Sequence, residues 1–151
     1  MPLLKDRALS DESWMVRTPA VQELARRWKD DSATLLLLQD LARTDEHEYV
    51  RRAALQELAR GWKDDPGTLP LLKDRAQSDE NPGVRRAALR EMARAWKDDP
   101  GTLPLLKDRA RSDEHESARS AALEELARGW KDDADVIAML SQMRSARISH
   151  V

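Results

Sequence analysis

The sequence contains no cysteine and no phenylalanine, and it has one tyrosine among its 151 residues. Without cysteine the chain has neither a disulfide nor a reactive thiolate, and its composition gives no sign of an oxidising compartment. Large aromatic side chains usually supply much of the buried area of a thick core. Their scarcity argues against one deep core and favours thin helical layers of leucine and alanine.

Long apolar segments and a strong net charge are also missing. No apolar run approaches the ~18 residues that a membrane span requires, and the first residues do not form a charged-then-apolar signal segment. The formal net charge is −2 at pH 7, which gives no strong global attraction to polyanions. We therefore expect a cytoplasmic protein without a membrane partner, and we disfavour nucleic acid as a ligand.

What the chain does contain is a repeat marked by tryptophan. Four tryptophans, each followed by Lys-Asp-Asp, lie 34 residues apart: Trp28, Trp62, Trp96 and Trp130. Residues 62–95 and 96–129 are identical at 25 of 34 positions. A fixed period of this length is typical of stacked structural units.

Within each unit the apolar residues follow the helical period. Val50, Ala54, Leu58 and Trp62 recur every four residues, as one face of a helix does. The same spacing predicts helices over 2–10, 14–29, 33–43, 48–62, 66–77, 82–96, 100–111, 116–130 and 134–146. Pro70 leaves open whether the fifth of these begins at 66 or near 68. Helices this short are unstable alone and must pack on their neighbours.

The pattern predicts an all-α protein: a right-handed α-solenoid of about four 34-residue helix pairs with a C-terminal capping helix. We expect one domain over 1–151, with units at about 1–31, 32–65, 66–99 and 100–133 and a cap at 134–151. An engineered consensus array would show similar identity between units, but the irregular ends favour natural duplication. The abrupt start also fits a piece of a longer solenoid.

The repeated unit resembles a known repeat family, and the resemblance covers nearly the whole chain. The run Asp45-Glu-His-Glu-Tyr-Val-Arg-Arg-Ala-Ala-Leu, with its counterpart at Asp79, is similar to HEAT repeats, in particular the short bacterial class also found in phycobilisome lyases. The resemblance implies that an aspartate and an arginine of each unit form a structural ladder that ties successive units together. Its members are Asp11, Arg17, Asp45, Arg51, Asp79, Arg85, Asp113 and Arg119.

Residues that resemble catalytic, metal-binding or ligand-stacking motifs have simpler structural explanations. His47-Glu48 and His115-Glu116 resemble part of a zinc-protease motif, but Arg51 and Arg119 stand where the second histidine is needed. The Asp-Asp pairs recur in every unit, whereas catalytic carboxylates need dissimilar surroundings; helix capping explains them. The repeated tryptophans continue the apolar stripe, so we expect core packing rather than ligand stacking. We therefore predict no enzyme activity, no catalytic residue, no metal and no cofactor.

When the units are aligned, three positions of the second helix differ from unit to unit while the other positions stay constant. Their spacing places them on one stripe of the helix, opposite the apolar face. We predict that this stripe binds a partner, although neutral drift of exposed positions would explain the variation equally well. The predicted binding residues are Met15, Thr18, Gln22, Tyr49, Arg52, Gln56, Arg86, Arg90, Ser120 and Glu124.

These features predict a non-catalytic scaffold or recognition module for another protein. Similar Trp-Lys-Asp-Asp-Pro arrays resemble repeats of bacterial signalling proteins, which implies a sensor or scaffold arm. Two alternatives stay open: a bilin lyase-like chromophore-handling protein, and a weak nucleic-acid-binding solenoid that uses the basic second helices. Glutamates three residues before arginines, such as Glu57 and Arg60, argue for ordinary helix-surface pairs instead. The apolar residues at the ends, Met1, Leu3, Ile137 and Ile148, would also allow an end-to-end homo-oligomer.

Overall fold

The computed structural model describes residues 5, 6, 8 and 10–149, and for residues 144–149 it describes the backbone alone. In this part of the chain every regular element is an α-helix. The helix predicted over 2–10 lies largely outside the described residues. The helices are α2 (Trp14–Arg27), α3 (Ser32–Thr44), α4 (Glu48–Gly61), α5 (Thr68–Ser78), α6 (Pro82–Ala95), α7 (Thr102–Ser112), α8 (Glu116–Gly129) and α9 (Ala134–Ser149).

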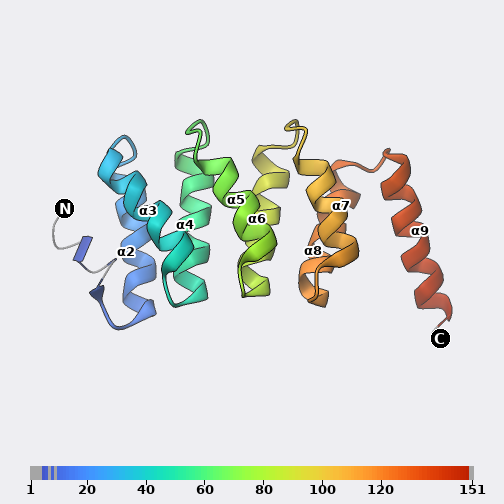
Figure 1. The fold of residues 1–151 in the computed structure, drawn as a ribbon, viewed down its shortest axis with the longest axis horizontal. Helices are drawn as coiled ribbons and strands as arrows, with labels where there is room; N and C mark the ends of the chain where they lie inside the picture. The colour runs from blue at the N-terminus through green and yellow to red at the C-terminus, as the bar shows by residue number, and fades with distance from the viewer. Residues whose placement is uncertain (1–4, 7, 9, 150–151) are drawn as a thin grey trace.

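The helices form an elongated stack of pairs. Within a unit α3 packs on α4, α5 on α6 and α7 on α8, and α9 lies against α8 at the end of the row. Helices α2 and α9 lie at opposite ends of the row (Figure 1). This arrangement confirms the predicted all-α stack of helix pairs with a terminal helix, because each pair buries its apolar face against the next.

Local signals explain where the helices begin. Asn81 caps α6 by accepting hydrogen bonds from the backbone of Gly83 and Val84, and Pro82 takes the first helical position. The fifth helix begins at Thr68 rather than at 66. Pro70 has no N–H to donate four residues back and would clash there with a helix begun at 66, whereas in a helix begun at Thr68 it falls in the first turn.

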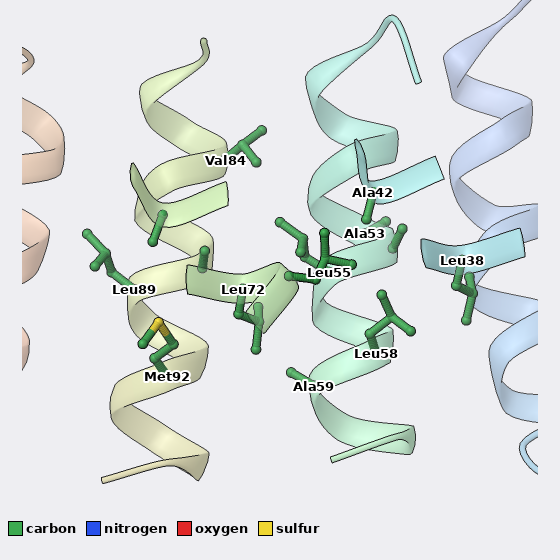
Figure 2. Close-up of a cluster of buried hydrophobic side chains, with 14 of the residues drawn as sticks. Leu38, Ala42, Ala53, Leu55, Leu58, Ala59, Leu72, Val84, Leu89 and Met92 are labelled. Carbon is green, nitrogen blue, oxygen red and sulfur yellow. The ribbon is translucent and has the colours of Figure 1, made fainter. Parts of the chain in front are cut away.

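A continuous apolar core follows the stack. Figure 2 shows Leu55 and Leu58 of α4, Leu72 of α5, and Leu89 and Met92 of α6 spread along the stack between the helices, and all five side chains are fully buried. The core extends as a ribbon from unit to unit, as the shortage of aromatic residues predicts. Burial of a side chain of this size contributes about 1.5–3 kcal/mol, so each interface depends on a few leucines.

The repeated tryptophans lie at the edge of this core rather than in its centre. Each is the residue after the last helical turn and is half-buried; Trp62, for example, donates its backbone N–H to the carbonyl of Leu58. The lysine that follows one tryptophan covers the tryptophan of the next unit: Lys97 Nζ lies 5.6 Å from the ring of Trp130. Lys63 lies 6.0 Å from the ring of Trp96 in the same way.

Candidate partner-binding face

The second helices of the units form the inner side of the stack. α2, α4, α6 and α8 contact one another in succession, whereas α3 and α5 touch only slightly. In a curved stack the helices of the inner layer lie closer together than those of the outer layer, so the closely packed second helices line the concave side. We call the exposed surface of α2, α4, α6 and α8 the concave face.

A ladder of arginine and aspartate joins the units beneath this face. Arg51 donates from Nε and Nη2 to the carboxylate of Asp79 at 3.0 and 3.1 Å, and from Nη1 to the carbonyl of Asp45 at 2.7 Å. Arg17 and Arg85 make the same bonds one unit earlier and one unit later. Each guanidinium thus links the start of its own second helix to the start of the next one.

The last arginine of the ladder differs from the others. Arg119 donates to the carbonyl of Asp113 at 2.6 Å, and it has no carboxylate partner within the part of the chain whose side chains the structure describes. Asp113 itself accepts from Arg85 and from the backbone N–H of His115. Burial would raise the pKa of the Asp113 carboxyl, but these hydrogen bonds outweigh it and hold the pKa below its ordinary value.

The concave face contains a hollow of about 650 Å³ between α4, α6 and α8. Arginine dominates its lining, together with Gln56, Trp130 and the small residues Gly83, Ala87 and Ala93. The lining arginines are Arg52, Arg60, Arg86, Arg90, Arg94 and Arg128. Such a set of forked, permanently charged donors suits carboxylate or phosphate groups.

The residues predicted to bind a partner all lie on the four second helices, and the structure buries none of them completely. The hollow brings four of them together: Arg52, Gln56, Arg86 and Arg90. The other six lie on the same helices but outside the lining of the hollow. These are Met15, Thr18, Gln22, Tyr49, Ser120 and Glu124. Their participation in binding stays a prediction.

Sequence reasoning missed Arg60, Arg94 and Arg128, because it assigned them to local pairs with glutamates on the same helix. Two of these pairs exist: Arg94 lies 2.9 Å from Glu91, and Arg128 donates to Glu125 at 2.8 Å. A useful signal was present, since Arg60 follows Arg52 and Gln56 at four-residue steps and continues their stripe.

The expected pairing of Glu57 with Arg60 is wrong. Arg60 reaches instead to Glu91 of the next unit, at 3.2 Å, and Arg26 lies 3.8 Å from Glu57 in the same manner. Glu91 is only 6% exposed, so these glutamates lie under the arginines rather than on the surface. Burial is also the main reason that the pKa of Glu57 is raised.

An aromatic cluster lies beside the hollow, at the N-terminal ends of α2 and α4. The ring of Trp14 stacks on His47 at 4.5 Å, and Tyr49 lies 4.9 Å from Trp14. The guanidinium of Arg52 covers Tyr49 at 4.9 Å, which connects the cluster to the hollow. His47 also caps α4 by accepting from the backbone N–H of Tyr49. The sequence showed Trp14 as an outlier but gave no sign of its partners.

Neither a metal site nor a membrane segment is found in the described part of the chain. No three histidine, aspartate or glutamate residues there are grouped so that they could hold a metal ion. Of the helices α2 to α9, none has the length and apolar character needed to cross a bilayer.

Comparison with known families agrees with this geometry. The family model for HEAT repeats matches residues 1–93 and again 35–127. The chain belongs to the HEAT-repeat family. HEAT repeats generally serve as scaffolds for protein interaction. A search of curated proteins found no match for the chain, and a search of solved structures found none either.

Proposed function

We propose that this HEAT array is a non-catalytic recognition module that binds a partner protein along its concave face. The hollow between α4, α6 and α8 carries the proposal, because it presents arginines from three successive units to one ligand. Arginine is among the residue types that dominate the binding energy of protein interfaces. A role as a sensor or scaffold arm of a larger signalling protein would use the same surface.

The ladder beneath the face supports a binding role. Each unit is held to the next by a forked pair such as Arg85–Asp113, with both distances at 2.9 Å. A surface that is already held in place loses less conformational entropy when it binds. The repeated framework therefore provides rigidity, and the variable positions above it provide specificity.

Affinity capture with matched variants tests the proposal. The immobilised chain is incubated with lysate of the source organism, and retained proteins are quantified by mass spectrometry. The concave variant replaces Arg52, Arg86 and Arg90 by alanine. The control replaces Arg43, Arg111 and Lys131, which are exposed and lie outside the second helices, so it loses the same charge.

We expect a set of proteins that the wild type and the control retain and that the concave variant loses. Circular dichroism should show the same helix content for all three proteins, because none of the substituted side chains is buried. If the concave variant retains the same proteins in the same amounts as the wild type, the concave face is not the binding surface and the proposal fails.

A further inference from the structure

The hollow concentrates positive charge that the rest of the chain does not share. Its six arginines and two glutamates, Glu91 and Glu125, leave a formal charge of +4. The whole chain carries −2, so the remainder of the molecule is acidic. A local field of this kind attracts a ligand of opposite charge to one place rather than to the whole surface.

The arginines of the hollow fall into two groups. Arg60 and Arg94 already pair with Glu91, and Arg128 with Glu125. These three are held in place within the protein. Their glutamate partners are nearly buried, and the charges of these pairs largely offset one another.

The other three arginines have donors to spare. Arg90 lies 3.8 Å from Glu124, with both side chains about half exposed. Arg52 lies over the Tyr49 ring and makes no ion pair with any side chain that the structure describes, so its N–H groups are available to a ligand. Arg86 makes no ion pair with any side chain that the structure describes, although it lines the hollow. These three arginines can donate hydrogen bonds to a ligand. We call Arg52, Arg86 and Arg90 the rim of the hollow.

Small side chains let a ligand come close to this rim. Gly83 stands at the start of α6, where a Cβ atom would lie 2.9 Å from Asn81 Oδ1 and 3.8 Å from Arg52 Nη1. Arg52 can therefore reach from α4 across the start of α6. Ala87 lines the hollow one turn further along α6, between Arg86 and Arg90.

The spacing of the rim matches an extended peptide. Arg86 and Arg90 are one helical turn apart, about 5–6 Å between Cβ atoms, and neighbouring helices lie about 8–10 Å apart. An extended chain advances about 3.3 Å per residue and its alternate side chains share a face, so side chains two residues apart point the same way and are separated by about 7 Å. Carboxylates at alternate positions, on one face of the peptide, would reach Arg52 of α4 and Arg86 or Arg90 of α6.

We infer that the hollow binds an acidic peptide segment of a partner, whose aspartate and glutamate carboxylates pair with Arg52, Arg86 and Arg90. This inference rests on the proposed function and gives it a ligand chemistry. A nucleic-acid ligand fits less well, because affinity for a duplex comes mainly from many lysine and arginine contacts to phosphates. The free rim has three arginines, and Glu124 lies beside them.

Fluorescence anisotropy with a synthetic peptide tests the inference. The probe is a fluorescein-labelled peptide of four Glu-Ser repeats, and its control carries lysine in place of glutamate. The variant R86A/R90A is compared with R43A/R111A, which removes two exposed arginines of α3 and α7. A single-stranded oligothymidine of equal charge and a run at raised salt complete the design.

We expect the wild type and R43A/R111A to bind the glutamate peptide equally and R86A/R90A to bind it about tenfold more weakly, as for the loss of two partly exposed charge pairs. Binding should weaken as salt rises from about 50 to 300 mM, because half-exposed pairs are screened. Equal affinity of both variants, no binding of the glutamate peptide, or tighter binding of the oligothymidine would overturn the inference.

The two proposals fail in different ways. Excess glutamate peptide should displace the proteins captured by the concave face. If the concave variant loses those proteins but the peptide does not displace them, the face binds a partner of other chemistry, and only the acidic-peptide inference is lost. If no captured protein depends on the concave face, the proposed function itself is lost.

Discussion

Removal of one ladder arginine should destabilise the stack strongly, and the same change one unit later should not. In the substitution Arg85→Met the chain keeps a long apolar side chain but loses three hydrogen bonds: two to the carboxylate of Asp113 and one to the carbonyl of Asp79. Arg85 is 4% exposed and Asp113 is fully buried, so water cannot replace the lost partner.

The magnitude follows from this burial. Loss of one partner of a buried ion pair costs about 3–5 kcal/mol, because the other charge stays buried without compensation. Arg109 lies 3.6 Å from Asp113 and compensates in part, so we expect a value near the lower end, about 3 kcal/mol. At roughly 2–4 °C per kcal/mol for a chain of this size, the midpoint of thermal unfolding should fall by about 6–12 °C.

Arg119→Met is the matched control, because Arg119 occupies the same position of the next unit. Its guanidinium has one hydrogen bond within the described residues, to the carbonyl of Asp113. A single bond of this kind contributes about 1 kcal/mol. Urea unfolding followed by circular dichroism measures both free energies. Equal losses for Arg85→Met and Arg119→Met, or a loss below about 1 kcal/mol for Arg85→Met, would refute the reasoning.

Three further predictions concern the carboxyl groups of two residues and one glycine. The pKa of Asp113 is lower in the folded chain than in the unfolded one, so its contribution to stability should be complete above about pH 4 and disappear as the pH falls through the folded pKa; Asp113→Asn should flatten this acid-side decline in urea unfolding. Burial raises the pKa of Glu57, so its charge costs stability at neutral pH, and that cost is relieved as the pH falls through the raised pKa. Glu57→Gln should therefore leave the free energy of unfolding at pH 7 unchanged or higher, and a loss above about 1 kcal/mol would contradict this, since the pair with exposed Arg26 is weak. Gly61→Ala should raise the melting temperature by an amount equivalent to about 0.5–1 kcal/mol, because a Cβ atom there meets nothing within 4 Å and the helix gains propensity; an unchanged or lower midpoint would show that this position is strained.

The sequence by itself determined the length of the repeat and the helices within it. Trp62, Trp96 and Trp130 recur at 34-residue intervals, and the apolar residues between them follow the helical period, so the helix pairs from α3 to α8 and the terminal helix could be predicted. These properties are local: the side chains that define a helix lie within a few residues of one another along the chain. Pro70 left the start of α5 open between 66 and about 68, and the structure places it at Thr68, where the proline falls in the first turn.

The tertiary structure decided which charged groups meet. Arg60 has a glutamate three residues before it but pairs with Glu91, 31 residues away, because the neighbouring helix brings that carboxylate closer in space. The aromatic contact of Trp14 with His47 also joins different units. The periodic sequence shows which residues share a face, whereas the packing of adjacent units determines which of them gather in one hollow, since the distances between helices depend on every side chain in the interface.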